Sequence, residues 1–506
     1  MTNQLLITSK TDWSEDLIRQ VYDEIETIAR EELLLNVYQN QIEIISADQM
    51  IDAYSSVGLP VMYNHWSFGK SFIKDWKAYQ SGSKGLAYEI VINSDPCISY
   101  LMEENDMVMQ TLVIAHAAFG HNAVFKNNYM FKTWTNAGSI IDYMMFAKRF
   151  ISQCEERYGV DVVEEVLDMA HMLSNNGVDH SKRKHKKKMS SEDAVTEMMR
   201  MEEEELKDFD LILKRTSLRR DETRDVQEEA EDDLNMSEEN LLYFIYKRSP
   251  NLPQWKKEIL RIVHKVNQYF LPQSNTKVLN EGFATFTHYY IMNRLEEKGI
   301  ISPDAHMSWL ASHSGVIFQT EYNSKYGFNG WNPYALGFAI FKDIKRICEN
   351  PTEEDKEWFP ALIGKDWREA IQDAAFEYRD ESFIQQFLSP KVIRDFRMFT
   401  ARYDNQGGVI KDISDSIGYA EIRKDLAESF ARINFVPEII IKGAEFSGDR
   451  TLHLKYNRFN DRDLDENTAA RVIAAIIKLW GYEVEFEGID WFPEDKVKMP
   501  PIQFYP

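Results

Sequence analysis

The sequence predicts a mainly α-helical protein with a mixed α and β part: a large helical core followed by a small α+β domain at the carboxyl end. Apolar residues recur at intervals of three and four over much of the chain up to about residue 399, which is the period of amphipathic helices. After Gly407 and Gly408 the pattern changes to short apolar runs that alternate with helical segments. With 506 residues, 44% of them hydrophobic, the chain can bury a large core.

The first part of the helical core is assigned to residues 1–180. It begins with an amphipathic helix from Trp13 to about Val37, whose apolar residues have helical spacing. The string GLAYEIVINSD at 85–95 alternates and contains β-branched residues, so it predicts a strand or a hairpin arm. Residues 105–125 are predicted to form the next long helix.

Residues 181–240 differ sharply in composition from both neighbouring parts. Lys182 to Lys188 are all basic, Glu202 to Glu205 are all acidic, and Asp221 to Glu239 contains ten acidic residues. Such runs do not bury enough apolar surface to form a packed core. We therefore expect a solvated insertion, and a docking segment for a charged protein partner is its functional interpretation.

The second part of the helical core is assigned to 241–405, and the small α+β domain to 410–506. One helix is predicted to begin at Trp255 and to end at Pro272, and the next is predicted from Val278 to Lys298. Further helices are expected at 334–349, 366–378, 381–399, 416–432 and 466–480, and strands at 436–442, 451–457 and 482–487.

Composition excludes several classes of function. The 82 acidic and 59 basic residues give a net charge of -23, which opposes general binding to nucleic acids or anionic lipids. Cys97, Cys154 and Cys348 lie far apart without a CxxC pair, so neither a disulfide framework nor a thiolate zinc site is indicated. The start lacks the pattern of a secretory signal, and no apolar run is long enough to span a membrane. These features predict a cytoplasmic protein.

The stretch LNEGFATFTHYY at 279–290 carries the main chemical signal. It places Glu281 and His288 seven positions apart on one apolar helix, almost two turns, so both side chains face the same way. Their Cα atoms would lie about 10 Å apart along the axis, so binding one ion requires the side chains to converge. The alternative is that Glu281 pairs with a basic neighbour and His288 is a hydrogen-bonded core residue.

Two further segments supply imidazoles. His116 and His121 in IAHAAFGHNAVF are five residues apart, which separates them by about 140 degrees on a regular α-helix. A π-bulge, or a helix that ends near Gly120, would bring them together. His65 in NHWSFGK lies beside Trp66, and it is either a ligand, a residue that orients substrate, or a loop histidine in an aromatic contact.

Several long strings in the same order resemble the SpoVR family, named for stage V sporulation protein R. They are YNHWSFGK, IAHAAFGHNAVFKNNYMF, LNEGFATFTHY, NPYALGFAIFKDIKRIC and DESFIQQFLSPKVIRDFRMF, and the resemblance runs from about residue 13 to 490. It implies a link to the spore cortex, a peptidoglycan layer, or to stress programmes that involve a serine kinase system. The chain departs from the family pattern at GVDHSKRK (177–184) and at Phe283 and Thr287, but Glu281 and His288 remain in place.

LNEGFA also resembles the segment by which gluzincin metallopeptidases supply a glutamate to zinc, which implies a zincin-like core. In those enzymes an HExxH helix comes first, whereas this chain has HAAFGH, so Ala117 stands at the position of the general-base glutamate. The resulting hypothesis uses His116, His121 and His288 as ligands of a divalent metal, with zinc the expected ion. Glu281 then completes the ligand set or acts as base, and His65 orients substrate or adds a ligand.

Two readings of function follow from these residues. The first is a metal-dependent hydrolase, an amidase or peptidase that acts on cell-wall precursors or on a regulatory protein. The second is a non-catalytic scaffold or regulator that recruits a partner of the kinase system through residues 181–240, and the missing glutamate at Ala117 favours it. A di-iron enzyme ranks last, because the sequence lacks the paired ExxH motifs that such helical bundles use.

Overall fold

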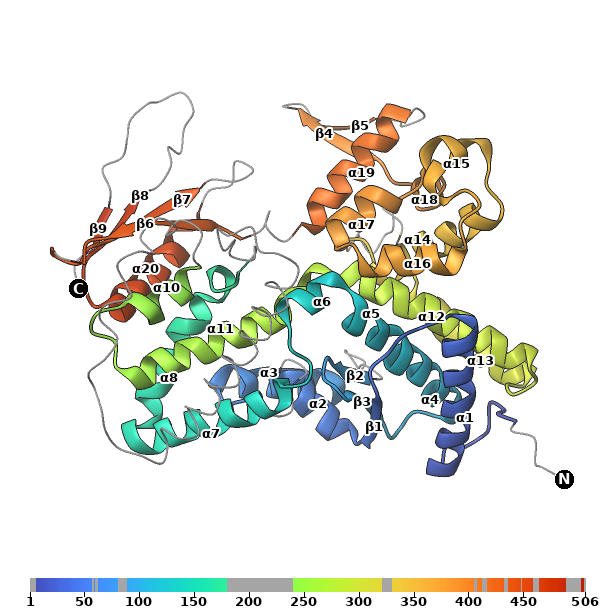
Figure 1. Ribbon diagram of the computed structural model, residues 1–506, viewed down its shortest axis with the longest axis horizontal. Coiled ribbons are helices and arrows are strands. Elements are labelled where there is room, and N and C mark those ends of the chain that lie inside the picture. Colours follow the sequence, from blue (N-terminus) through green and yellow to red (C-terminus); the bar gives the residue numbers. More distant parts are fainter. Residues whose placement is uncertain are drawn as a thin grey trace, which may run out of the picture.

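The computed structural model describes most of the chain (Figure 1). The described residues are 6–56, 59, 62–80, 89–179, 240–320, 330–404, 407–411, 416–431, 436–446, 448–457, 464–487 and 502–504. The predicted insertion at 181–240 therefore lies outside the described residues, except for Asn240. Within the described residues, no helix is long and apolar enough to cross a membrane.

Helices dominate the fold, as the sequence predicts. In the first half they are α1 (Glu15–Thr27), η1 (Ile28–Glu32), α2 (Ala47–Ser55), α3 (Trp66–Gln80), α4 (Met107–Ile114), η2 (Ala115–His121), α5 (Asn122–Asn127), α6 (Tyr129–Trp134), α7 (Ile140–Tyr158), α8 (Val160–Met172) and η3 (Ser174–Asn176). In the second half they are α10 (Leu241–Arg248), α11 (Gln254–Asn275), α12 (Lys277–Glu297), α13 (Pro303–Val316), α14 (Pro333–Glu349), α15 (Glu353–Trp358), η5 (Pro360–Leu362), α16 (Trp367–Phe376), α17 (Asp380–Phe387), α18 (Pro390–Asp395), α19 (Ser416–Phe430) and α20 (Glu466–Trp480).

The strands form three small sheets. The first is mixed, with the order β1 (Asn40–Ile45), β3 (Cys97–Met102), β2 (Glu89–Ile92), and β2 is an edge strand antiparallel to β3. The second pairs β4 (Thr400–Asp404) with β5 (Gly407–Lys411). The third has the order β6 (Glu438–Ala444), β7 (Leu452–Asn457), β8 (Val484–Glu487), β9 (Ile502–Phe504).

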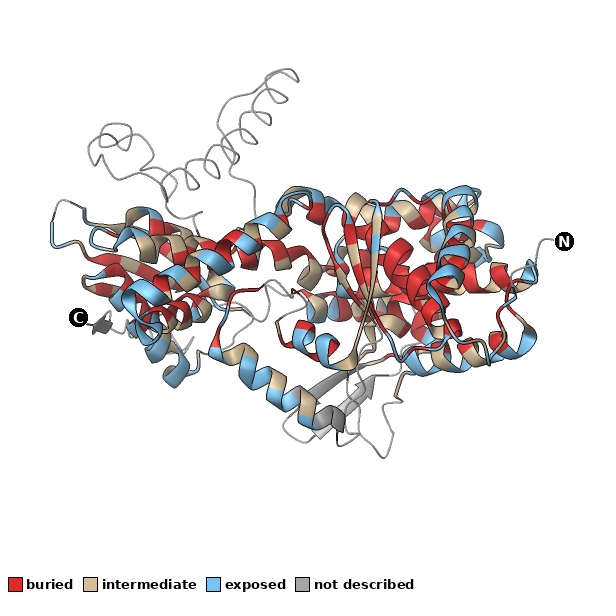
Figure 2. Cartoon of the chain, turned by 90° about the horizontal axis from the view of Figure 1, so that it is seen from below, coloured by how far each residue is buried: buried red, intermediate tan, exposed pale blue. Residues whose placement is uncertain are grey.

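Two hydrophobic cores organise these elements. The larger core is built from α1, α4, η2, α5, α12, α13, α14 and α16 to α19, and it surrounds α12 (Figure 1). The second core joins α7, α8, α10 and α11 to the sheet β6–β8 and to α20. Colouring by burial shows buried residues concentrated along the inner helices and exposed residues on the outer ones (Figure 2). By packing, α19 belongs to the larger core, and the small α+β unit starts at β6.

Most predicted elements are present, and three predicted helices have other bounds. The helix predicted from Trp13 to about Val37 ends with η1 at Glu32, and Leu34 beyond it has a positive φ of 57°. Pro272 does not stop α11, which continues to Asn275, because a proline in the last turn removes only one backbone hydrogen bond. The helix predicted at 381–399 is broken into α17 and α18, because Ser389 caps a new helix that has Pro390 at its first position.

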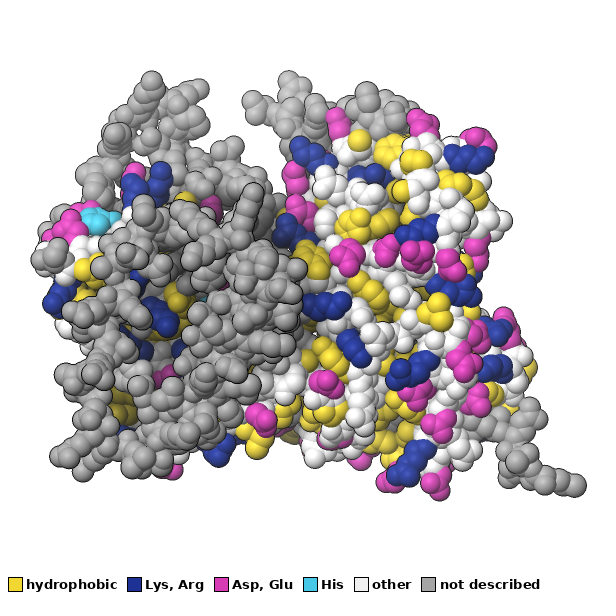
Figure 3. Space-filling model, viewed as in Figure 1, with side chains coloured by type: hydrophobic (Ala, Val, Ile, Leu, Met, Phe, Trp, Pro, Cys, Tyr) yellow, Lys and Arg dark blue, Asp and Glu magenta, His cyan; other side chains and the backbone are white. Residues whose placement is uncertain are grey.

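The described part of the surface carries mixed charges. On the face shown in Figure 3, acidic and basic side chains are interspersed over the larger core, without a continuous basic tract among the described residues. All three cysteines are free and buried.

Candidate metal centre

A π-helix brings His116 and His121 together. Residues Ala115–His121 form η2, whose hydrogen bonds run over five residues, so side chains five positions apart lie on the same side. The two imidazole rings meet edge to face, with centroids 4.6 Å apart. The bulge that the spacing requires is therefore present, and both histidines are buried in the larger core.

Helix α12 carries the acidic partner of these histidines. Its first turn is held by Asp380 of α17, whose carboxylate accepts hydrogen bonds from the backbone N–H groups of Val278 (3.0 Å) and Leu279 (2.8 Å). Asn280 and Glu281 follow immediately. The position of the α12 amino terminus, and with it that of Glu281, is thus fixed by a buried capping carboxylate.

Glycines allow neighbouring helices to approach α12 closely. A Cβ at Gly120 of η2 would lie 2.6 Å from the Cα of Ala284 on α12. On another side of α12, a Cβ at Gly282 would collide with the backbone of Gly337 on α14. The glycines at both crossings keep the backbones near enough for side chains of η2, α12 and α14 to reach one another.

The carboxylate of Glu281 lies against both imidazoles. Its Oε2 is 3.5 Å from Nε2 of His121 and 3.8 Å from Nε2 of His116. A second carboxylate comes from the edge strand β2, where Glu89 Oε1 lies 3.8 Å from His116 Nε2. The ligand atoms of Glu89, His116 and His121 all fall within 4.8 Å of one another.

The other ring nitrogens of the two histidines are occupied. His121 Nδ1 is 3.0 Å from Asn280 Oδ1, and His116 Nδ1 is 2.9 Å from Nδ1 of His288. Both Nε2 atoms therefore face the carboxylates. Hydrogen bonds of this kind orient the imidazole rings of metal sites and fix their tautomers.

Burial and charge shift the pKa values of the cluster in different directions. Desolvation raises the pKa of Glu89, and repulsion from Glu281 adds to the rise. Desolvation also opposes ionisation of Glu281, but its contacts with His116 and His121 outweigh this and hold its pKa below the ordinary value. Burial lowers the pKa of His121 to about 4, and it lowers that of His288 well below normal.

These residues fit a divalent cation. Glu281 Oε2 is buried and accepts no hydrogen bond from any described residue, which leaves a carboxylate oxygen with two imidazole nitrogens at 3.5 and 3.8 Å as its near neighbours. Ligand atoms around a tetrahedral ion with bonds of about 2.0 to 2.2 Å lie roughly 3.3 to 3.6 Å apart. The observed spacings are too long for good hydrogen bonds and close to those of ligands that share an ion.

Tyr334 covers the same cluster from the first turn of α14. Its ring is stacked near His116, with centroids 6.4 Å apart, and burial raises the pKa of the tyrosine, with the charges of Glu281 and Glu89 adding to the rise. The side chains of Glu89 and Glu281 are each 19% exposed. Most of both side chains is therefore shielded from solvent, and Oε2 of Glu281 is buried.

The structure does not join His65 to this cluster. Its Nδ1 lies 2.6 Å from Ser67 Oγ and its Nε2 lies 3.1 Å from Asp168 Oδ1. The ring also meets His171 edge to face, at 4.5 Å between centroids. Among the described contacts of His65, none involves His116, His121 or Glu281.

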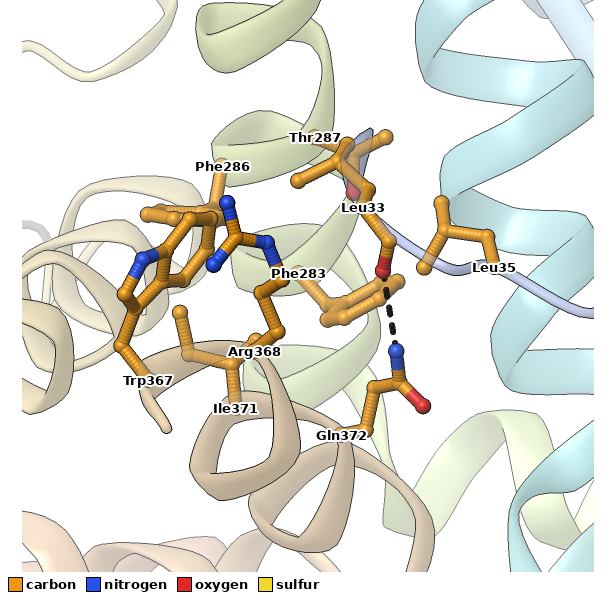
Figure 4. Close-up of a pocket in the computed structure, with 9 residues that line it drawn as sticks. All are labelled: Leu33, Leu35, Phe283, Phe286, Thr287, Trp367, Arg368, Ile371 and Gln372. Carbon is orange, nitrogen blue, oxygen red and sulfur yellow. Dashed lines mark hydrogen bonds between the residues drawn. The ribbon is translucent and has the colours of Figure 1, made fainter. Parts of the chain in front are cut away.

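A small apolar hollow lies on the side of α12 opposite Glu281. Phe283, Phe286 and Thr287 line it together with Trp367, and Gln372 donates a hydrogen bond from Nε2 to the carbonyl of Leu33 (2.9 Å) at its edge (Figure 4). Its lining contains none of the metal-ligating candidates. We therefore regard it as a packing feature behind the site.

Three residues of the cluster were not found from the sequence. Glu89 stands at the start of the apolar run EIVI, where a charge facing inward is unusual. Asn280 directly precedes Glu281, and Tyr334 lies in the NPYALG string. Each signal is visible in hindsight, but only the fold places these residues beside His116 and His121.

Comparisons with known proteins identify the family. The model described as "SpoVR like protein" matches residues 12–435, and the model described as "SpoVR-like C-terminal domain" matches 437–491. The chain is 49% identical over 478 residues to "Uncharacterized protein YcgB" of Escherichia coli (strain K12), which covers 94% of this chain and 92% of that protein. No solved structure matches the chain. The resemblance inferred from the motifs is confirmed, and the chain belongs to the SpoVR family.

Proposed function

We propose that this protein is a metal-dependent hydrolase in which His116, His121 and Glu281 hold the ion and Glu89 acts as the catalytic base. The observation that carries the proposal is the buried, unpartnered Oε2 of Glu281 between two Nε2 atoms at 3.5 and 3.8 Å. Three protein ligands with an open position are typical of catalytic zinc sites, whereas structural sites are closed. Zinc is the expected ion, and the same ligands also bind iron or manganese.

In this proposal Glu89 supplies the general base that gluzincin metallopeptidases carry at the position of Ala117. Ala117 is fully buried and has no acidic group, but Glu89 reaches the same cluster from the opposite element, the edge strand β2. Its Oε1 lies 3.8 Å from His116 Nε2, whereas Glu281 Oε2 lies 3.8 Å from His116 Nε2 and 3.5 Å from His121 Nε2. The raised pKa of Glu89 and the lowered pKa of Glu281 support a division of labour between a base and a ligand.

Bound at this place, a zinc ion would lower the pKa of a water molecule towards about 7 and polarise a carbonyl group. Glu89 would take a proton from an attacking water, and Tyr334 would shield the Glu281 carboxylate from the side of α14. The substrate class that we propose is a peptide or a cell-wall-derived peptide.

Elemental analysis of protein purified without chelators tests the metal site. We expect one ion per chain in the wild type, and loss of the ion in His116→Ala and Glu281→Gln. His264→Ala is the matched control, because His264 is also a buried histidine but bonds to the Gly177 carbonyl in the other core. A wild-type protein without metal, or a Glu281→Gln protein that keeps it, contradicts the proposal.

Hydrolysis of muropeptides, with unrelated peptides as control substrates, tests the reaction. Glu89→Gln is expected to keep the metal and lose activity by about 100-fold or more, since removing a general base typically costs 10² to 10⁴ in rate. If Glu89→Gln loses the ion, Glu89 is a ligand and the assignment as base is wrong. If neither substrate class is cleaved by metal-loaded wild type, the hydrolase assignment for these substrates fails.

A further inference from the structure

Behind His116 the structure places two more buried histidines in a hydrogen-bonded chain. His116 Nδ1 is 2.9 Å from His288 Nδ1 on α12, and His288 Nε2 is 2.9 Å from His313 Nδ1 on α13. Both nitrogens of His288 are therefore engaged by other imidazoles. We infer that His288 and His313 are positioning residues that select the His116 tautomer able to bind a metal, an inference that rests on the proposed metal site.

The directions of the two hydrogen bonds are linked. His288 and His313 are 2% and 4% exposed, and each 2.9 Å contact between two imidazole nitrogens needs one donor and one acceptor, so a His288 ring with a single N–H donates at one nitrogen and accepts at the other. If His116 Nδ1 donates to His288 Nδ1, then His288 carries its proton on Nε2 and donates to His313 Nδ1. In this state His116 Nε2 has a free lone pair that faces Glu281.

The reverse direction blocks the metal position. If His313 Nδ1 donates to His288 Nε2, then His288 donates from Nδ1 to His116 Nδ1, and the proton of His116 lies on Nε2. That nitrogen then points an N–H at the carboxylates and has no lone pair for an ion. The state with His313 as acceptor is the one that binds metal.

Packing holds His313 in the position that the chain requires. Its ring is surrounded by Tyr289, Trp309 and Phe338, with centroid distances of 5.3, 5.6 and 5.0 Å. The ring has little freedom to turn away from His288. This arrangement also explains why His288, predicted from the sequence as a ligand, lies behind His116 rather than beside Glu281.

Substitutions at His313 distinguish its role as a hydrogen-bond acceptor for His288 from its role in filling space in the core. His313→Asn keeps an oxygen near the position of Nδ1, whereas His313→Leu fills the space without an acceptor, and a buried N–H of His288 would be left unpaired. His313→Gln moves its amide towards the position of Nε2, away from His288. His306→Leu is the matched control, because His306 lies on the same helix and bonds only to Asn293 among described side chains.

The test is the Zn²⁺ dissociation constant of each metal-free protein, measured by competition with a chelator, with urea unfolding of the same metal-free proteins alongside. We expect His313→Leu and His313→Gln to bind Zn²⁺ about 10- to 100-fold more weakly than wild type, and His313→Asn and His306→Leu to bind it within about threefold. Wild-type affinity in His313→Leu, or equal losses in His313→Asn and His313→Leu, overturns the inference. If His313→Leu does not fold, the Asn and Gln proteins decide. Wild-type protein that binds no Zn²⁺ refutes the metal site itself.

Discussion

At the scale of single residues, the site depends on buried carboxyl groups whose ionisation is set by their neighbours. Glu281 is kept ionised by two imidazoles, although burial alone would favour its neutral form. Asp380 shows the opposite balance. It is only 3% exposed, and burial raises its pKa to about 7 in spite of the backbone N–H groups that it accepts at the start of α12.

Asp380 therefore predicts a pH dependence of stability. Its pKa in the folded protein is raised above the ordinary value of 3.8, so the folded state binds a proton that the unfolded chain releases. The stability contributed by this group is complete below about pH 4 and is lost as the pH rises to about 7. Asp380→Asn removes this dependence, and relative to Asn the wild type should lose on the order of 2 kcal/mol between pH 5 and 7. Urea unfolding of both proteins at pH 5, 6, 7 and 8 checks this, and parallel pH profiles would refute it.

His116, His121 and Glu281 lie together, and their residue types and spacing indicated this from the sequence. Their role as metal ligands stays a prediction, and His288 and His65 do not lie beside Glu281. Glu89, Tyr334 and Asp380 come from a strand and two helices distant in sequence, and no local pattern indicates which groups the tertiary fold brings to α12.

At the scale of elements, the site is made by a π-helix and two close helix crossings. An α-helical turn would place His116 and His121 about 140 degrees apart, and η2 removes that separation. The sequence predicts this bulge only if both histidines are assumed to belong to one site. The close contacts of α12 with η2 and α14 could not be predicted, because they depend on which glycines face each other across the crossings.

Glycine-to-alanine substitutions test these crossings. Gly282→Ala would push a methyl group into the backbone of Gly337, so we expect a loss of about 2 kcal/mol or more in the free energy of unfolding, together with weaker metal binding. Gly315→Ala on α13 is the matched control, since no atom lies within 4 Å of its Cβ position. It should be neutral or stabilising by up to about 1 kcal/mol through helix propensity. Urea unfolding that shows equal effects for the two variants would contradict the close-packing account.

At the scale of the whole molecule, the helical core and the small α+β unit were both predictable, because helical and alternating apolar periods persist over long stretches. The joining of the small unit to α7, α8, α10 and α11 in one core was not predicted, since no local pattern shows which faces pack together. The two ends of the charged insertion also meet. Asn240 donates a hydrogen bond to the carboxylate of Asp179, and Gln268 bonds to the backbone N–H of Asp179 at 2.7 Å.

Because these ends lie side by side, the charged insertion should be removable. Replacing residues 181–239 by a short glycine and serine linker is expected to leave metal content and the melting temperature within a few degrees of wild type, since both flanks keep their anchors. Loss of the metal or a large fall in melting temperature would show that the insertion contributes to the core. Pull-down of the kinase-system partner with the deleted and full-length proteins tests the docking interpretation in the same experiment.

The central claim is that one ion joins η2 to α12 through His116, His121 and Glu281. Anomalous diffraction from crystals of the zinc-loaded protein, collected on both sides of the zinc absorption edge, tests it most directly. We predict one strong peak about 2.0 to 2.2 Å from Nε2 of both histidines and from a Glu281 oxygen. A zinc-loaded crystal with no peak between these three side chains, or with its peak elsewhere in the protein, would contradict the account.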